Sequence, residues 1–389
     1  MPASPQGTTL DGPALDALLA TRAEPPALLA LGEPTHGIAA FPLLRNDILA
    51  HLVDRGYRSI ALETDVFAAA LVDDHVTGGD ADLDTVLATG FSHGFGRVPG
   101  NRELLDWLRA HNTGRAPADQ VRFHGFDAPL EFAAAPSPRR SLHTVADHLP
   151  ASLRPVSARD LDALLGDDAA WSDEAAMYDP AASIGDSEHA RALRVVADDL
   201  ASALRRAAPD LRPADPTGYD HAAAHARTAL GLLRYHAAMA TPAVDRLGNL
   251  AGVRAEMMAD NLLAILAAGH GPCLVFAHNA HLQPARSEGA AGWGNAGALV
   301  ARTLGSRYLF VATDANPAGE PGTLQGVLAA ATTGRTLFPA DTLRAALDPS
   351  VRAGEPILPG HIPLTPADLD GADAVVFIAD TDGTRHRYW

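Results

Sequence analysis

The stretch LALGEPTHGIAAFPLLRND, residues 29–47, places a carboxylate, an imidazole and a guanidinium after an apolar run. Glu33, His36 and Arg45 follow one another within thirteen positions. A carboxylate can orient an imidazole, and an imidazole that titrates near neutrality is suited to taking a proton from water. These residue types therefore indicate general acid–base chemistry at the end of a buried strand.

Six short apolar runs, each bounded by turn residues, recur along the chain with helical patterns between most of them. They cover residues 27–33, 58–64, 121–127, 273–279, 308–315 and 374–380. Continuous apolar strands that alternate with helices are typical of a sheet covered on both faces. The sequence therefore predicts an α/β fold with a largely parallel central sheet flanked by helices.

The apolar part of each of the first four runs stops at an ionisable residue, namely Glu33, Glu63, Asp127 and His278. In open α/β sheets, ligands bind beyond the carboxyl ends of the strands, so the side chains at those ends are candidates for one site. The predicted catalytic groups are Glu33, His36, Arg45, Glu63, His278 and His281. The predicted substrate-binding groups are Asp127, Asn279 and His93.

Arg45 falls inside the apolar stripe of the helix predicted after His36. Phe41 lies four residues before it and Ile48 three residues after it, so all three share one helix face. An unpaired guanidinium on a buried face costs roughly 3–5 kcal/mol. Glu33 and Glu63, at the ends of strands expected to be neighbours, are the predicted partners of Arg45.

Metal binding is an alternative to acid–base chemistry for these residues. His278 and His281, three apart and near carboxylates, suit a divalent metal as well as acid–base work. However, the chain has no HExxH motif and no clustered cysteines, and Arg45 brings a positive charge to the cluster, so no metal ligand and no cofactor are assigned.

GFSHG, residues 90–94, matches the nucleophile elbow with Ser92 as nucleophile, but a helical pattern precedes it and a glycine–proline loop follows it. We therefore expect Ser92 to lie in a loop and to have no nucleophilic role.

Residues 128–260 contain few apolar runs and long helical patterns at 187–209 and 219–240, with a turn expected at 208–218. This pattern predicts a helical subdomain inserted over the carboxyl-terminal rim of the sheet, where it would wall a cleft. The predicted divisions are 1–127 for the first part of the α/β core, 128–260 for the insertion and 261–389 for the second part.

Composition narrows the function classes. The formal net charge is −17, lysine is absent and no basic stripe occurs, which argues against nucleic acid as a partner. A single cysteine, Cys273, excludes an intramolecular disulfide framework. No run of eighteen apolar residues and no signal-peptide pattern is found, so we expect no membrane partner and a cytoplasmic location.

Taken together, the motifs resemble the erythromycin esterase family. The segments that carry the resemblance are LGEPTHG, ALETD, NRELLDWLRAHN, FHGFD, RAEMMADN and AHNAHL, in this order between about residues 28 and 315. The resemblance implies hydrolysis of an ester or macrolactone without a serine nucleophile, with water activated by His36. It places the family's essential groups on the same six residues that the strand ends and the helix stripe indicate. Pro34 departs from the small residue more usual there, but a proline keeps the preceding Glu33 extended.

The leading hypothesis is thus a hydrolase that cleaves a small-molecule ester, lactone or other natural product by general-base attack of water. A second hypothesis keeps the site but uses it for elimination, cyclisation or rearrangement of a natural-product intermediate. A third is a binding protein without catalysis. A role in macrolide resistance and a role in natural-product biosynthesis both stay open, as does the oligomeric state.

Overall fold

The computed structural model describes residues 5–131, 134–285, 292–316, 318–379 and 381, which form two compact units. One unit takes its described residues from 1–126 and 262–389, and the other from 127–261. The expected role of the inserted segment as a cleft wall stays a prediction. None of the helices in the described ranges combines the length and the apolar character that crossing a membrane requires.

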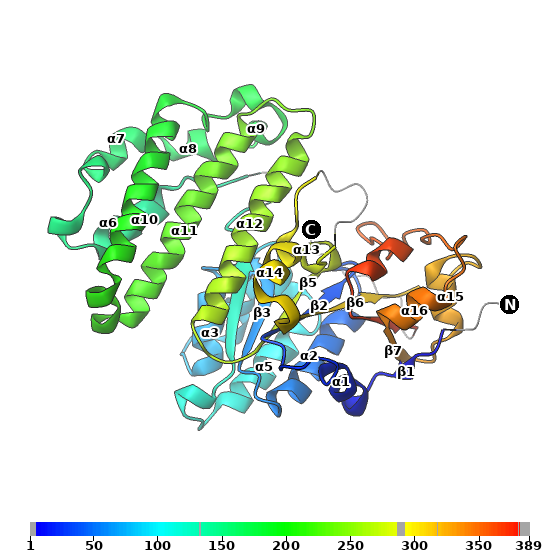
Figure 1. Cartoon of the computed structure of the whole chain (residues 1–389). Helices are drawn as coiled ribbons and strands as arrows, with labels where there is room; N and C mark the ends of the chain where they lie inside the picture. The colour runs from blue at the N-terminus through cyan, green and yellow to red at the C-terminus, as the bar shows by residue number, and fades with distance from the viewer. Residues whose placement is uncertain (1–4, 132–133, 286–291, 317, 380, 382–389) are drawn as a thin grey trace. The chain divides into compact units, whose positions relative to one another are not determined.

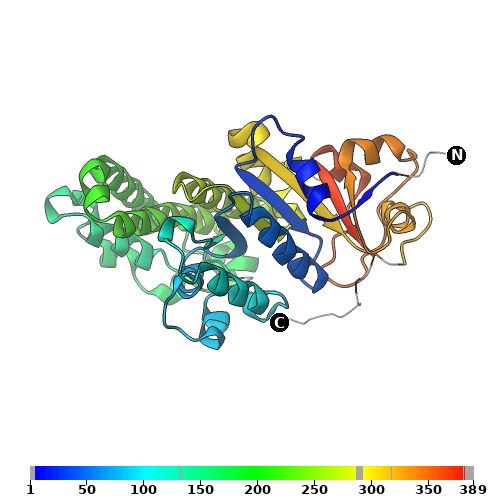
Figure 2. The same ribbon diagram turned by 90° about the horizontal axis from the view of Figure 1, so that it is seen from below.

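The first unit is built on an eight-stranded sheet with the order β1-β7-β8-β6-β2-β5-β3-β4. The strands are β1 (Thr8–Thr9), β2 (Leu28–Glu33), β3 (Ser59–Asp65), β4 (Arg122–Asp127), β5 (Cys273–His278), β6 (Tyr308–Asp314), β7 (Arg335–Pro339) and β8 (Ala374–Ile378). β2 pairs in parallel with β5 and β6, β3 with β5, and β6 with β8. In Figure 2 the blue, gold and red strands lie side by side, although they come from distant parts of the chain. The predicted α/β fold with a largely parallel sheet is confirmed.

Two features of the sheet differ from the prediction. β1 and β7 were not predicted, and they form an antiparallel edge in which β7 pairs with both β1 and β8. β1 has only two residues and β7 begins with arginine and ends with proline, so neither has the long apolar run that marks the other strands. In addition, the strands that carry Glu33 and Glu63 are not neighbours, because β5 lies between them.

Helices cover the sheet, and one of them carries Arg45. The helices of this unit include α1 (Gly12–Leu19), α2 (Ala40–Val53), α3 (Ala69–Thr77), α4 (Leu83–Thr89), α5 (Asn101–Asn112), α13 (Asn279–Leu282), α14 (Ala296–Leu304), α15 (Leu324–Ala330) and α16 (Ala340–Ala346). On α2 the predicted apolar stripe, from Phe41 to Leu52, is buried, and Arg45 within it is only 1% exposed. β2 and β5 are buried along their whole length, which explains their uninterrupted apolar sequences.

The second unit is helical. It contains α6 (Arg139–His148), α7 (Leu161–Leu165), α8 (Asp168–Trp171), α9 (Ala175–Tyr178), α10 (Glu188–Ala214) and α11 (Pro216–Met239), and α12 (Arg246–Ala267) begins within it. α10 and α11 lie side by side, as Figure 1 shows. The turn expected at 208–218 is wrong, because α10 continues through Pro209 and Pro213 and only Asp215 separates the two helices. Asp215 caps α11 by accepting the Gly218 N–H, which allows this abrupt junction.

Candidate active site

Three adjacent strand ends supply the site. Glu33 lies opposite His278 in the register of β2 and β5, and Leu62 lies opposite Phe276 in the register of β3 and β5. Glu63 directly follows Leu62. Because the three strands run in parallel, their carboxyl ends meet at one edge of the sheet. β5 therefore carries His278 between the two carboxylates.

Glu33 and His36 form a hydrogen-bonded pair where β2 leads into the turn before α2. Glu33 Oε1 lies 2.7 Å from His36 Nδ1, and the side chain of His36 is 20% exposed whereas that of Glu33 is buried. Burial raises the pKa of the Glu33 carboxyl, and the hydrogen bond to His36 opposes this shift. No described residue lies within hydrogen-bond distance of the buried Glu33 Oε2. The pair thus combines a reachable imidazole with a carboxylate that has one unused oxygen.

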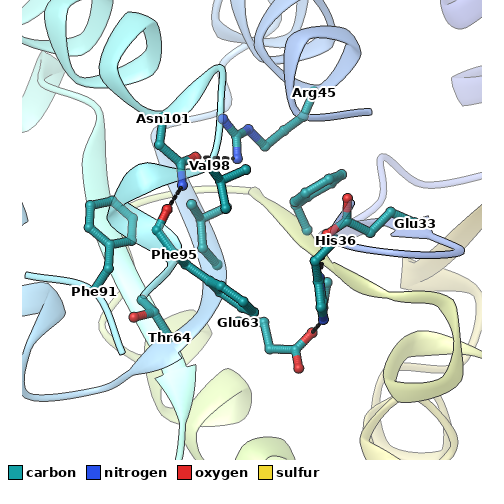
Figure 3. A pocket seen from close by; sticks show the side chains of 12 residues that line it. Glu33, His36, Arg45, Glu63, Thr64, Phe91, Phe95, Val98 and Asn101 are labelled. Atoms are coloured by element: carbon teal, nitrogen blue, oxygen red, sulfur yellow. Dashed lines mark hydrogen bonds and ion pairs between the residues drawn. The ribbon is translucent and has the colours of Figure 1, made fainter. Parts of the chain in front are cut away.

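Glu63 contacts the histidines of the site. Its Oε2 accepts a hydrogen bond of 2.9 Å from the backbone N–H of His278, and its Oε1 lies 3.1 Å from His281 Nε2. His36 Nε2 is 3.9 Å from Oε2, which is longer than a hydrogen bond. Figure 3 shows the Glu63 carboxylate facing the His36 ring. Glu63 is therefore held by β5 at a distance from which it would stabilise a positive charge on His36.

Both ring nitrogens of His278 form hydrogen bonds with main-chain groups. Its Nε2 lies 3.0 Å from the Pro34 carbonyl oxygen, which can only accept, and its Nδ1 receives the Ala280 N–H at 3.1 Å. These partners require the neutral tautomer with the proton on Nε2. Burial lowers the pKa of His278 to about 3, which agrees with a neutral ring. The arrangement favours a positioning role for His278, and its predicted catalytic role stays untested.

Arg45 is buried without the expected ion pair. Its Nη1 donates to Asn101 Oδ1 at 2.9 Å, its Nη2 donates to the Gly100 carbonyl at 3.2 Å, and both Nε and Nη2 donate to Asn46 Oδ1. Within the described ranges no carboxylate forms an ion pair with Arg45, so the predicted pairing with Glu33 or Glu63 is wrong. Burial lowers the pKa of Arg45 to about 9, and the more distant charge of Glu33 opposes the shift. The guanidinium therefore remains cationic at neutral pH.

These groups surround a small cavity. Its volume of about 30 Å³ is enough for roughly two water molecules. Its polar lining comprises Glu33, His36, Arg45, Glu63, Thr64 and Asn101, and its apolar lining comprises Leu62, Phe91, Phe95, Val98, Phe276 and Ala277. Figure 3 shows the side chains of Arg45, His36 and Glu63 around this space. The cavity therefore suits a water molecule or the reacting group of a substrate, close to a base, two carboxylates and a cation.

The predicted substrate-binding residues lie outside the lining of this cavity. Asn279 is buried, and its amide bonds the backbone carbonyl and N–H of Thr313 on β6. Asp127 is fully buried and forms a two-bond ion pair with Arg254 of α12. His93 adopts a left-handed backbone conformation with φ 56°, and its ring lies 5.5 Å from that of Phe95. The side chains of Asn279 and Asp127 thus bond Thr313 and Arg254 within the protein. Substrate binding by the three residues stays a prediction.

Two residues of the site were not singled out in the sequence. Asn101 binds Arg45 and also donates from Nδ2 to the Phe95 carbonyl at 2.8 Å, and the Phe95 ring lies 4.7 Å from that of His36. Asn101 is the first residue of α5 and follows a glycine, a helix-start pattern that could have indicated it. Phe95 sits in a glycine-rich loop, where the sequence carries no comparable signal.

A metal centre was the alternative chemistry for these histidines. In the parts of the chain that the structure describes, no group of three His, Cys, Asp or Glu side chains is arranged to hold a metal ion. His278 has both nitrogens committed to the main chain, so it would have to give up a hydrogen bond to bind one. The expectation that the site works without a metal stays a prediction.

Comparisons with known proteins agree with this architecture. Residues 52–350 match the profile of the erythromycin esterase family. Among solved structures, a Bacillus cereus protein is 17% identical with a TM-score of 0.69, over 97% of this chain and 94% of its own. A mutant of the erythromycin esterase EreC in its open conformation is 17% identical with a TM-score of 0.69, over 98% and 96%. A succinoglycan biosynthesis protein is 14% identical with a TM-score of 0.63, over 98% and 95%. At these identities the similarity to solved structures shows the fold alone, and no curated protein matches.

Proposed function

Since the chain belongs to the erythromycin esterase family, we propose that it is a hydrolase that cleaves an ester or macrolactone by direct attack of water. The substrate is a small molecule, and no serine nucleophile takes part. Glu33, His36 and Arg45 precede the residues that match the family profile, so their roles rest on the geometry of the site.

The observation that carries this proposal is the Glu33–His36 pair beside the cavity. Glu33 Oε1 lies 2.7 Å from His36 Nδ1, so in the proposed mechanism His36 carries its proton on Nδ1 and uses Nε2 as the base. The cavity that His36 lines has room for about two water molecules. A base of this kind contributes roughly 10²–10⁴-fold to the rate when it is within reach of the water.

The other groups have complementary roles. Glu63 would stabilise the imidazolium that forms when His36 takes the proton of water. Arg45 uses four of its N–H groups on Asn46, Asn101 and Gly100, which leaves one to bind the carbonyl oxygen of the substrate as it gains negative charge. His281, which is 26% exposed, would bind the leaving alkoxide, and His36 would give this alkoxide the proton that it took from water. His278 would keep the turn that carries His36 in place through the Pro34 carbonyl.

Mass spectrometry tests the proposal. The protein is incubated with a panel of macrolides, simple lactones and simple esters, and a lactone product heavier by one water, or the acid and alcohol of an ester, is the expected result. His36→Ala should lower the rate of product formation by at least about 100-fold, whereas His143→Ala, which removes an exposed histidine that also bonds a carboxylate, should not. A product of unchanged mass or one lighter by water would instead support cyclisation, rearrangement or elimination at the same site.

A further inference from the structure

The GFSHG segment belongs to a loop that is attached to the strand end carrying Glu63. The backbone N–H of Ser92 donates to Thr64 Oγ1 at 2.8 Å, and Ser92 Oγ accepts the Asp65 N–H at 2.9 Å. The two hydroxyl oxygens are also 3.2 Å apart. Ser92 thus bonds the two residues that follow Glu63, while α4 precedes the loop and a short 3-10 helix, Phe95–Arg97, follows Ser92. The strand–turn–helix context of a nucleophile elbow is therefore missing here.

The same loop reaches both His36 and Arg45 through Phe95. The Phe95 ring lies 4.7 Å from the His36 ring at an angle of 49°. Its backbone carbonyl accepts a hydrogen bond from Asn101 Nδ2, and Asn101 Oδ1 in turn accepts one from Arg45 Nη1. Figure 3 shows these two hydrogen bonds in sequence, from Arg45 through Asn101 to Phe95. One residue of the loop therefore contacts the base directly and the cation through a single amide.

Close packing defines the conformation of the loop. A Cβ at Gly96 would lie 1.7 Å from the Leu87 carbonyl oxygen of α4, so only glycine fits at this position. Gly94 and Gly100 take positive φ angles of 70° and 88°, which glycine adopts without strain. The segment between them is thus set against α4, and its shape places the Phe95 ring and carbonyl.

The His36 ring needs such a contact. Its bond to Glu33 fixes the position of Nδ1, but this bond alone does not fix the plane of the ring. The rings of Phe95, at 4.7 Å, and of His278, at 5.7 Å, both lie against it. Both contacts restrict rotation of the imidazole and so contribute to the direction in which Nε2 points. A misplacement of about 1 Å at a reacting centre can cost on the order of 10²-fold in rate.

We propose that residues 90–100 form a positioning loop that sets the His36 ring and the Arg45 guanidinium together, with Phe95 as the positioning residue and Ser92 as its anchor. The inference rests on the proposed function of the site and deepens it. It gives the GFSHG motif a role in which the serine hydroxyl is a hydrogen-bonding group of the loop and in which no covalent step occurs.

NMR of the free protein tests the ring placement without any substrate. The proton on His36 Nδ1 should give a downfield resonance, assigned by its disappearance in His36→Asn. In Phe95→Ala this resonance should broaden or vanish, whereas Phe95→Tyr should retain it. Phe95→Leu serves in place of the alanine variant if melting curves show that the latter does not fold. An unchanged resonance in folded Phe95→Ala or Phe95→Leu would overturn the proposal.

Kinetics on an identified substrate give the second readout. Phe95→Ala should lower kcat by about 10- to 100-fold with little change in KM, and Phe95→Tyr should recover most of it. Ser92→Ala should keep kcat within about tenfold of wild type, since it removes the hydroxyl bonds of the anchor and no nucleophile. Thr89→Ala, which removes an exposed hydroxyl that bonds only within α4, is the matched control and should leave kcat unchanged.

If His36→Ala is inactive but Phe95→Ala matches wild type in both readouts, the loop proposal fails and the proposed function survives. Full activity of His36→Ala would instead refute the assignment of His36 as the base of the proposed function.

Discussion

Two histidine–carboxylate pairs follow neighbouring parallel strands of this sheet. Glu33 ends β2 and bonds His36 at 2.7 Å, and Asp314 ends β6 and bonds His361 at 3.0 Å. In residue type, distance and place relative to the strand, the two pairs are nearly alike. They differ in what the rest of the carboxylate does.

Asp314 has no spare bonding capacity. Its Oδ1 accepts from His361 Nε2 and the Ala315 N–H, and its Oδ2 accepts from Gln325 Nε2 and the Leu364 N–H. The other ring nitrogen of His361 accepts the Ile357 N–H, and both side chains are fully buried. Glu33, in contrast, leaves Oε2 without a hydrogen bond from any described residue, and its histidine lines a cavity. A saturated pair stabilises a fold, whereas unused bonding capacity beside a cavity is available for chemistry.

The saturated pair also supports the reactive one. It fixes the segment that contains Ile362, whose backbone N–H donates to the Pro34 carbonyl at 2.9 Å. The same carbonyl oxygen accepts the bond from His278 Nε2. Pro34 lies between Glu33 and His36 in the sequence, so both hydrogen bonds hold the turn that carries the base.

The largest effect should follow from removing the reactive histidine. His36→Ala should lower kcat by roughly 10²–10⁴-fold with little change in KM, because proton transfer matters in the transition state and hardly in binding. The melting temperature should stay close to that of wild type, since the Glu33 carboxyl can take up a proton when its partner is lost. Steady-state kinetics beside a melting curve provide the measurement. A near-normal kcat would move the role of base to His281.

Loss of the saturated pair, Asp314 and His361, should lower the stability of the fold. Asp314→Ala removes the acceptor of His361 Nε2 and of the Ala315 and Leu364 N–H groups, and one of the two acceptors of the Gln325 amide. Each buried donor left unpaired costs about 1–3 kcal/mol, so the free energy of unfolding should fall by about 3–5 kcal/mol. Urea unfolding measures this change. Asp348→Ala, which removes an exposed carboxylate bonded only to Ser350, is the control. A loss similar to that of the control would show that the two pairs do not differ as argued.

Glu33→Gln should separate activity from stability. It should lower kcat by about 10- to 100-fold, because the imidazole loses its orienting carboxylate but remains present. Burial raises the folded-state pKa of Glu33 above its ordinary value of 4.5, so the folded protein holds this proton more tightly than the unfolded chain. The contribution of Glu33 to stability is therefore fully present below pH 4.5 and is lost as pH rises through the folded pKa.

The glutamine variant lacks this titration, so relative to wild type it should gain stability as pH rises from about 4 to 8. Unfolding curves for both proteins across this range give the comparison. A constant difference between them at every pH would mean that Glu33 has the same pKa in the folded and unfolded states.

The smallest effect is expected from chelation. Dialysis against EDTA should leave both kcat and the melting temperature unchanged, because no three His, Cys, Asp or Glu side chains in the described residues are arranged so that they could hold a metal ion. Elemental analysis of protein purified without added metal accompanies the assay. Stoichiometric zinc together with activity that EDTA removes would favour the metal hypothesis.

Much of the fold could be predicted because burial leaves a local pattern. Six apolar runs correspond to β2, β3, β4, β5, β6 and β8, and the stripe on α2 correctly predicted a buried Arg45. Glu33, His36, Glu63, His278 and His281 were found as a group because parallel strands bring their carboxyl ends to one edge of the sheet.

What only the tertiary structure decided is how each polar group is satisfied. Strand order depends on contacts between residues more than two hundred positions apart, and it inserted β5 between the two glutamates. That insertion places His278 where its ring must serve the main chain at Pro34 and Ala280. Arg45 obtains amide and carbonyl oxygens from the start of α5 instead of a carboxylate. Sequence by itself determined which residue types reach the strand ends, because hydrophobic periodicity is local. Which of them keep bonding capacity for chemistry is a property of the assembled contacts, because a hydrogen bond depends on the position of both partners.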